Sequence, residues 1–153
     1  MTINQVIKKL KTLSEPKLLK LNYKIGVLVK NEIINAFIDE KDPITKIKWK
    51  PLALSTVTKK NKKRSTNKIL RDSGHLSDYW AITPNSNGVV VSNNMAKSPK
   101  GFAYGLSHQW GSKTKNIPQR RFLPLLSPNT LSLDIKAKIK KTILKALVED
   151  FKN

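Results

Sequence analysis

The stretch EPKLLKLNYKIGVLVKNEIINAFIDEKDP, residues 15–43, decides the fold of this chain of 153 residues. Ser14 stands at a position suited to a helix N-cap, and Pro43 forbids continuation of a helix at the far end. The pattern between them predicts one long helix over residues 15–39. Gly26 lies inside it, where it either allows another element to pack closely or is merely tolerated. The apolar residues that form one broad stripe are Leu18, Leu21, Ile25, Leu28, Ile33, Phe37 and Ile38.

Two amphipathic patterns flank this long helix along the chain. At the N-terminus, apolar residues recur at helical spacing from Ile3 to Leu13, which predicts a short helix that ends before Pro16. Near the C-terminus, apolar residues fall every four positions opposite a row of lysines, which predicts a helix with a basic outer face. Its start is expected at Ser127-Pro128. The apolar positions are Ile135, Ile139, Ile143, Leu147 and Phe151, and the lysines are Lys136, Lys138, Lys140, Lys141 and Lys145.

A β-hairpin gives the clearest strand signal. The segments LSDYWAIT (residues 76–83) and GVVVSNN (88–94) bracket the turn-forming run PNSNG (84–88). Aromatic and β-branched residues favour strands, and Asn and Gly tolerate positive φ in a turn. Farther along the chain, residues 102–110 are expected to form a short helix closed by Gly111, and residues 117–125 are expected to be extended.

These elements predict a single α+β domain over residues 1–153. In it, a small antiparallel sheet with a β-hairpin packs against the long N-terminal helix and the C-terminal amphipathic helix. A length of 153 residues suits one domain, and 39% hydrophobic residues suffice for a modest core. The lack of Cys excludes disulfides, thiolate zinc sites and Cys nucleophiles. No signal peptide and no run of about 18 apolar residues occurs, so we expect a soluble protein made in the cytoplasm without membrane contact.

Charge is the most extreme property of the composition. Thirty basic and 10 acidic residues give a net charge of +20 and a pI near 10.3, which attracts polyanions. We expect residues 44–70 to form an exposed basic loop with one or two helical turns, in which Trp49 and Pro51-Leu52 dock on the core. The loop either contacts nucleic acid or is a Lys-rich solvated surface, since it lacks aromatic residues for base stacking. Its candidate contacts with DNA or an acidic partner are Lys59, Lys60, Lys62, Lys63, Arg64 and Lys68.

Signatures of catalysis are scarce in the sequence. The chain has no G-x-S-x-G elbow, phosphate-binding glycine loop or H-E-x-x-H pair, and its two histidines stand 33 residues apart without an acidic cluster to complete a metal site. The run DSGHLSD, residues 72–78, brings Asp, Ser and His close in sequence, but catalytic triads are assembled in space. We therefore expect a turn at Ser73-Gly74, with Leu76 entering the hairpin strand, and a structural hydrogen-bonding role for His108. No catalytic residue, metal or cofactor is predicted.

Several short motifs occur in an order that carries more information than any one of them. They are Trp49-x-Pro51-Leu52 with Thr56 and Lys59 downstream, ILRDSGHL (69–76), a hairpin ending in VVVSNN, YGLSHQWG (104–111) and IPQRRFLPL (117–125). In this order the chain resembles the bacteriophage virion morphogenesis family, the Mu G-like tail completion proteins, over about residues 49–125 and an expected C-terminal helix. It departs from the family pattern at Trp110, Gln119 and Arg121, where the family usually has Phe, Ala and Pro, and it lacks the Gly that usually precedes the Trp49 motif.

The resemblance implies a non-enzymatic structural protein of the virion neck that acts late in tail maturation, so that filled heads can join tails. Related neck proteins form rings, commonly hexameric. The resemblance therefore also implies a homo-oligomer that meets the head connector or adaptor and the tail terminator or tail tube. It implies assembly in the host cytoplasm and a final place in the virion. The residues expected to contact another subunit or a partner are Trp49, Tyr104, His108, Trp110, Arg120, Phe122 and Leu123.

These expectations leave alternatives at three levels. Phe122 and Trp110 either complete the core of the monomer or contact a neighbouring subunit, and Arg120 is expected to make bidentate contacts with a carboxylate or a carbonyl cluster. The basic loop faces either DNA in the lumen of a ring or an acidic ring of the connector or tail terminator. Two other functions stay open: a tail terminator ring that caps the tail tube, and a stand-alone basic module that binds nucleic acid.

Overall fold

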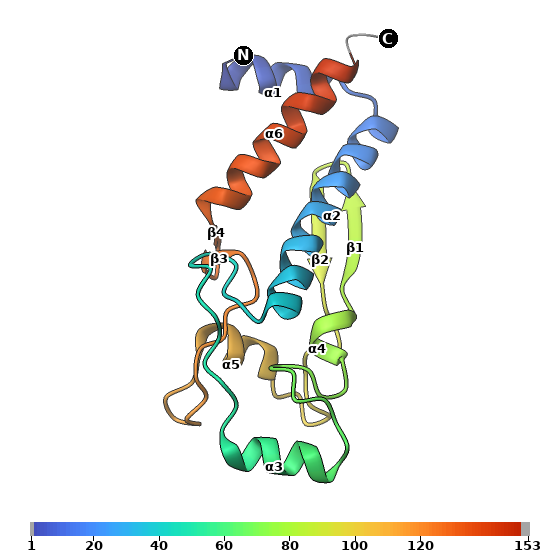
Figure 1. The fold of residues 1–153 in the computed structure, drawn as a ribbon. Coiled ribbons are helices and arrows are strands. Elements are labelled where there is room, and N and C mark those ends of the chain that lie inside the picture. The colour runs from blue at the N-terminus through green and yellow to red at the C-terminus, as the bar shows by residue number, and fades with distance from the viewer. Residues whose placement is uncertain (1, 151–153) are drawn as a thin grey trace.

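Helix α2 (Glu15–Asp39) runs through the middle of the computed structural model, which describes residues 2–150. The β-hairpin lies along one side of α2 and helix α6 (Leu133–Asp150) along the other (Figure 1). Helix α1 (Ile3–Thr12) lies at one end of this elongated molecule and α3 (Leu54–Lys62) at the opposite end. The α+β class, with its long N-terminal helix, small antiparallel hairpin and C-terminal helix, is confirmed.

The bounds of α2 are those that the sequence predicts. Ser14 occupies the N-cap position, although its side chain makes no capping hydrogen bond. The helix ends because Glu40 adopts a left-handed conformation with φ of 54°. Ile33 and Phe37 are buried, whereas Ile38 is 57% exposed. The buried stripe is therefore narrower than the sequence predicts, and it includes Ala36 in place of Ile38.

The hairpin is confirmed, but its strands are shifted along the chain. Strands β1 (Ala81–Asn85) and β2 (Gly88–Ser92) pair antiparallel, from Ala81 opposite Ser92 to Asn85 opposite Gly88. Only two residues, Ser86 and Asn87, form the turn. No residue of this turn has a positive φ. Instead, the side-chain Oδ1 of Asn85 accepts a hydrogen bond of 2.8 Å from the backbone N–H of Asn87, so a polar side chain shapes the turn.

The prediction that Leu76 enters the hairpin strand is wrong, because residues before Ala81 form helix α4 (His75–Asp78). The turn expected at Gly74 is present: this glycine has φ of 79° and precedes the helix. Leu76 is 4% exposed, and its carbonyl accepts a hydrogen bond of 3.0 Å from the indole Nε1 of Trp80. The helical turn thus places Leu76 and Trp80, four residues apart, on one face that packs into the core.

Gly26 marks the closest approach of the hairpin to α2. A Cβ atom at this position would lie 2.5 Å from Cγ2 of Ile82 and 2.8 Å from Cγ2 of Val89. Both distances are shorter than real van der Waals contacts, so only a glycine lets β1 and β2 pack this close to the helix. Of the two explanations that the sequence left open for Gly26, the structure supports close packing.

We expect Gly26→Ala to lower the free energy of unfolding by about 1 kcal/mol, since overpacking costs more than the gain of about 1 kcal/mol in helix propensity. Urea denaturation measures the effect. Gly88→Ala is the matched control, because no atom outside its neighbours lies within 4 Å of a Cβ there. In an Ile82→Ala background the loss caused by Gly26→Ala should shrink. Equal losses in both backgrounds would contradict a clash with Ile82.

Four aromatic rings from four segments form the centre of the core. Phe37 of α2 lies with its ring centroid 5.6 Å from that of Trp49 and 5.2 Å from that of Phe122. The ring of Phe122 is in turn 6.1 Å from that of Trp80. Burial of such rings dominates core energetics. The core therefore joins the end of α2, the chain before α3, the start of the hairpin and the segment after α5 (Tyr104–Trp110).

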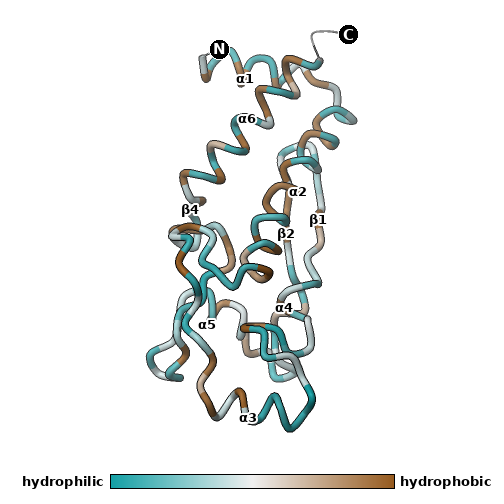
Figure 2. The backbone as a smooth tube through the Cα atoms, viewed as in Figure 1, coloured by the Kyte–Doolittle hydropathy of each residue, from teal (hydrophilic) through white to brown (hydrophobic). Residues whose placement is uncertain are grey.

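The C-terminal helix starts later than the sequence predicts. Ser127-Pro128 does not begin it, because strands β3 (Leu125–Ser127) and β4 (Thr130–Leu131) form a second small hairpin first. Ile135 and Leu147 are buried, as their spacing predicts, and α6 contacts α2 and α1. Phe151 lies outside the described residues. Hydrophobic and hydrophilic residues alternate along α2 and α6 (Figure 2), and no helix within residues 2–150 has the length and apolarity to cross a membrane.

The region expected to be an exposed basic loop contains α3, a helix of nine residues, so it is more ordered than predicted. We call residues 50–71 the arm: α3 and the two segments that connect it to the rest of the molecule. Trp49 is 5% exposed, which confirms that it docks on the core, and Leu52 packs partly buried against the same cluster. Ile69 returns the chain to the core, where its backbone N–H donates to Oε1 of Glu40 at 2.7 Å.

Candidate functional site

A large open groove lies between the arm, the loop before α4, helix α5 and residues 111–120. Its volume is about 1330 Å³. The short motifs that are far apart in the sequence meet there, because the groove is lined by parts of the Trp49 segment, of residues 69–76, of α5 and of residues 117–120. The groove therefore brings together five of the predicted site residues, Lys60, Tyr104, His108, Trp110 and Arg120.

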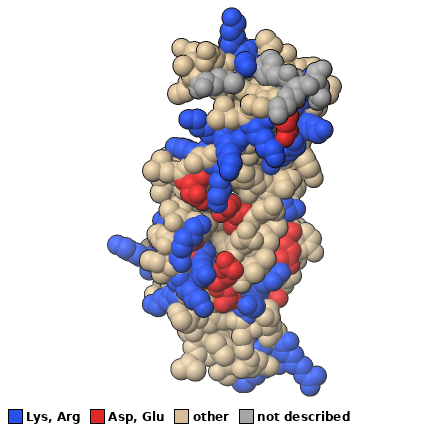
Figure 3. Space-filling model, turned by 45° about the horizontal axis from the view of Figure 1, so that its top comes forward, with Lys and Arg blue, Asp and Glu red and all other residues tan. Residues whose placement is uncertain are grey.

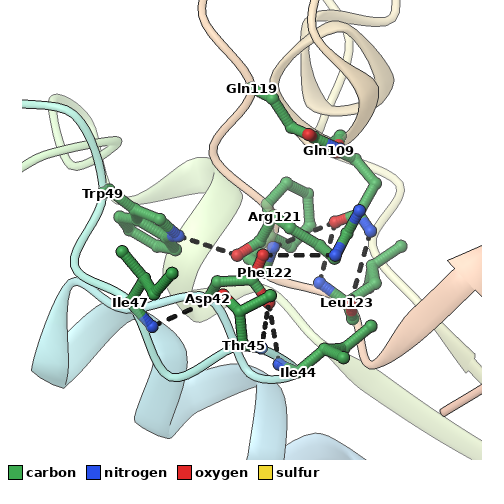
Figure 4. A network of polar contacts seen from close by, with 10 residues as sticks. All are labelled: Asp42, Ile44, Thr45, Ile47, Trp49, Gln109, Gln119, Arg121, Phe122 and Leu123. Carbon is green, nitrogen blue, oxygen red and sulfur yellow. Dashed lines mark hydrogen bonds and ion pairs between the residues drawn. The ribbon is translucent and has the colours of Figure 1, made fainter.

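Gln109 of α5 holds the wall of the groove to the core (Figure 4). Its side chain is fully buried, at 0% exposure. Its Oε1 accepts hydrogen bonds from the backbone N–H groups of Phe122, at 2.9 Å, and Leu123, at 2.8 Å. Its Nε2 donates to the carbonyl of Leu123 at 3.3 Å. One amide side chain thus supplies the polar partners of a buried, irregular stretch of backbone.

The sequence did not single out Gln109, although it stands inside the His108–Gly111 motif. The relevant signal is chemical: Gln carries both a donor and an acceptor, so it can pair with an extended backbone that has no strand beside it. Phe122 is 2% exposed, which places it in the core of the monomer. Leu123 is partly buried against the same core. Of the two alternatives for Phe122, the structure therefore shows the one in which this residue completes the core of the monomer.

A second contact in Figure 4 joins the segment after α5 to the end of α2. The indole Nε1 of Trp49 donates to the carbonyl of Arg121 at 2.8 Å, and the guanidinium of Arg121 lies 3.3 Å from Oδ2 of Asp42. The other carboxylate oxygen, Oδ1 of Asp42, accepts from the backbone N–H groups of Ile44, at 2.7 Å, and Thr45, at 3.1 Å. Asp42 therefore fixes both the loop after α2 and a basic side chain, another role that the sequence did not indicate.

Arg120 binds the start of the arm. Its Nε donates to the carbonyl of Lys50 at 2.9 Å and its Nη2 to the carbonyl of Pro51 at 3.0 Å. The prediction of a bidentate contact names two possible acceptors, and the structure shows the carbonyl pair. The residue is 7% exposed, and burial lowers the pKa of its guanidinium. Because these contacts are within one chain, Arg120 positions the arm relative to α5.

His108 lies beside Arg120 on the wall of the groove. Its carbonyl accepts the backbone N–H of Arg120 at 2.7 Å, and its ring Nδ1 is buried without a hydrogen-bond partner. Burial, and secondarily the charge of Arg120, lower the pKa of the ring. The side-chain role that the sequence predicts, a satisfied hydrogen-bonding group, is therefore not seen at Nδ1. The ring is held neutral in the folded protein at pH 7.

We expect the stability of the protein to fall as the pH drops below about 6.5, because the unfolded chain then takes up a proton at His108 that the folded chain does not. The effect is absent above that pH and levels off below the lowered pKa of the folded state. Urea denaturation at pH 7.5 and at pH 5.5 measures it. His108→Asn should show a smaller difference between the two pH values, and an unchanged difference would contradict this role of the ring.

Two aromatic residues of α5 complete this wall. Tyr104 is partly buried, its hydroxyl donates to the carbonyl of Met95 at 2.7 Å, and burial raises the pKa of that hydroxyl. Trp110 is partly buried and lines the groove. The helix begins at Tyr104, two residues later than predicted, and Gly111 with φ of 77° follows it as expected. Of the seven residues predicted to contact a subunit or partner, Tyr104, His108, Trp110 and Arg120 line the groove, whereas Trp49, Phe122 and Leu123 belong to the core or pack on it.

The basic residues of the arm divide into two kinds. Lys60 points inward, and its Nζ donates to the carbonyls of Thr66 and Lys68, both at 3.0 Å, and of Arg71 at 2.5 Å. This one ammonium group closes the arm into a loop, so Lys60 has a structural role that the sequence did not indicate. The remaining predicted contacts with DNA or an acidic partner are exposed: Lys59, Lys62, Lys63, Arg64 and Lys68.

The groove itself is basic. Only one of its lining residues is acidic, Asp72, whose Oδ1 accepts from the hydroxyl of Ser65 at 3.0 Å. The basic lining residues are Lys50, Lys60, Arg71, Lys97, Lys113 and Arg120. Figure 3 shows that Lys and Arg side chains also lie in several groups on one face of the molecule, with smaller acidic patches between them. Within residues 2–150, no group of three His, Asp or Glu side chains is placed to hold a metal ion.

Comparisons with known proteins give one match. The family model described as the phage virion morphogenesis family matches residues 1–149 of the chain. Neither the curated proteins nor the solved structures contain a match. The family match covers nearly the whole chain, including the long helix and the C-terminal helix as well as the motifs that line the groove. The chain therefore belongs to the phage virion morphogenesis family.

Proposed function

We propose that this protein is a tail completion protein of the head–tail neck, where it joins filled heads to tails as part of a ring around the DNA channel. The observation that carries the proposal is the family match over residues 1–149, which supports a structural role in the phage virion.

The exposed apolar surface of α1 is consistent with assembly into an oligomer. This helix has no buried residue, and Ile3 and Ile7 are 74% and 46% exposed. A helix of 10 residues is marginal without a packed apolar face. Contact with a neighbouring subunit of the ring would bury these side chains, and contacts between two different surfaces of identical subunits generate a ring when the rotation between subunits closes.

The net charge of +20 gives a second argument for the place in the neck. Identical subunits with this charge repel one another in a closed ring, and the repulsion is relieved when a polyanion or an acidic protein lies beside them. Duplex DNA in the channel and acidic neighbours in the neck both supply negative charge. The basic side chains of the arm are the exposed groups that we assign to this contact.

The basic arm can be tested without unfolding it. We expect replacement of Lys59, Lys62, Lys63 and Arg64 by Gln to weaken head–tail joining or DNA affinity at low salt, because each lost phosphate contact reduces counterion release. Lys60 is left intact because its ammonium holds three carbonyls of the arm. Joining in a complementation assay and DNA titrations at two salt concentrations measure the effect. Unchanged joining and unchanged DNA affinity would contradict a role of these side chains in binding.

The proposed function itself is tested by electron microscopy of lysates from a phage that carries a stop codon in this gene. We expect full heads lying apart from complete tails, and joined particles after the protein is added back. Normal joined particles would overturn the assignment to the neck. Full heads with tails of uncontrolled length would indicate a tail terminator instead.

The charge also favours a second candidate function, a stand-alone module that binds nucleic acid. Such a protein would bind duplex or single strands as a monomer, with an affinity that falls steeply with salt. Light scattering and a salt series on the purified chain distinguish the two candidates. Steep salt dependence without any oligomer, together with normal particles in the stop-codon phage, would favour the stand-alone module.

A further inference from the structure

We propose that the groove between the arm and α5 binds an extended acidic segment of a neighbouring virion protein, with apolar side chains between its carboxylates. The inference rests on the proposed function in the neck, since it names the chemistry of the partner that this protein would hold there. The groove, at about 1330 Å³, has room for several residues of an extended chain.

The charges of the groove favour an acidic occupant. Lys50, Lys97 and Lys113 line it with exposed side chains. Its one acidic lining residue, Asp72, already accepts a hydrogen bond from Ser65. A segment with several carboxylates would therefore meet a basic rim that lacks a matching number of acids.

The walls of the groove favour a peptide over duplex DNA. Leu52, Leu70, Tyr104, Trp110 and Ile117 line it and are only partly buried. Phosphates on the outside of a duplex gain nothing from such apolar walls, whereas a peptide can bury apolar side chains against them and direct carboxylates to the basic rim. The groove thus combines the two kinds of surface that an acidic and apolar segment requires.

The arm itself needs something to pack against. Helix α3 makes no extensive contact with another described helix or strand, and Leu54 is 85% exposed. A helix of nine residues is marginal on its own, so α3 depends on the anchors at Arg120 and Lys60. A chain lying in the groove would contact the inner face of α3, where Thr56 lines the cavity. This contact would supply the packing that the monomer lacks.

A second copy of this chain suits the groove poorly as an occupant. The chain carries only 10 acidic residues, and two of the three acids in its densest acidic stretch, DEKD at residues 39–42, are engaged inside the fold. Within it, Glu40 accepts the backbone N–H of Ile69, and Asp42 pairs with Arg121. We therefore assign the acidic segment to a different protein.

The first experiment titrates the purified full chain with a fluorescently labelled peptide of alternating Glu and Leu, with a Gln-for-Glu version and with a short DNA duplex. Fluorescence anisotropy should show about tenfold tighter binding of the Glu peptide than of the Gln peptide. Lys97→Glu combined with Lys113→Glu should weaken binding of the Glu peptide about tenfold.

The control is Lys136→Glu combined with Lys141→Glu, which makes the same change in net charge at two exposed lysines of α6. We expect it to leave the affinity for the Glu peptide nearly unchanged. Equal losses in both double variants, or no loss in either, would overturn the proposal, because binding would then not be localised to the groove. The groove would be assigned to DNA instead if DNA displaces the Glu peptide from the wild type and binds the variant with Lys97→Glu and Lys113→Glu about tenfold more weakly.

The second experiment places a photocrosslinking amino acid in the groove within assembled particles. Asn116, an exposed lining residue, is the first position, and Trp110 is the second. Tyr23, 51% exposed on α2, is the control. Cross-links from the groove positions to an acidic segment of another virion protein support the proposal. Cross-links to a second copy, to DNA or to nothing overturn it. If the stop-codon phage shows full heads apart from complete tails but the groove positions give no such cross-links, only the assignment of the groove fails. The proposed function in the neck then stands.

Discussion

Replacing Gln109 by Ala should lower the free energy of unfolding by about 3 kcal/mol. The change leaves two backbone N–H groups, the buried one of Phe122 and the partly buried one of Leu123, without an acceptor, and it opens a cavity at a fully buried position. Because the unpaired groups lie next to the aromatic core, water cannot replace the lost acceptor without disturbing the packing of Phe122. Urea denaturation followed by circular dichroism measures the loss.

Gln119→Ala is the matched control for this prediction. Its side chain is of the same type and lies close by, where its Nε2 donates to the carbonyl of Gln109 at 3.2 Å, but the residue is exposed. We expect it to cost less than about 1 kcal/mol, since water can take its place. If both variants lose the same stability, the Oε1 contacts of Gln109 are not what holds the segment after α5.

The second large effect is expected from Arg120→Met, which should lower the free energy of unfolding by about 2 kcal/mol. Met keeps much of the volume but leaves the carbonyls of Lys50 and Pro51 without their donor. Since this contact joins the arm to α5, amide hydrogen exchange in α3 should accelerate by more than exchange in α2. Urea denaturation and hydrogen exchange with mass spectrometry measure the two parts of the prediction.

Arg71→Met serves as the control for the loss of an arginine at the other end of the arm. Arg71 pairs with Asp78 at 2.9 Å, and its side chain is 38% exposed, so its removal should cost less than about 1 kcal/mol. Exchange in α3 that accelerates equally in both variants, or in neither, would contradict the role of Arg120 as the anchor of the arm.

The helices and the hairpin could be predicted because their signals are local. The 3.6-residue period fixes α2 and α6, and Pro43 limits how far α2 can extend. Local signals fail where the core decides between two conformations. Leu76 and Trp80 fit a strand by composition, yet Gly74 starts a helical turn that sends both into the core.

The candidate site could be predicted only in part, because motif order names residues without saying what they touch. Tyr104, His108, Trp110 and Arg120 do meet in one groove. The partners of these and neighbouring side chains are backbone groups distant in sequence, such as the carbonyl of Pro51 for Arg120. No periodicity or composition records such a contact, since any residue supplies a carbonyl. Lys60 and Gln109 were missed as anchors for the same reason.

The glycine in the middle of α2 has a consequence for the opposite end of the molecule. It makes a notch into which the methyl groups of Ile82 and Val89 fit. If the hairpin slid along the helix by one turn, about 5.4 Å, these groups would meet side chains instead of the notch. The notch therefore sets the position of the hairpin along α2, and with it the position of the preceding segment at residues 71–76, which forms one side of the groove. The absence of one methyl group, at Gly26, thus influences the dimensions of the groove, although helix α2 does not line it.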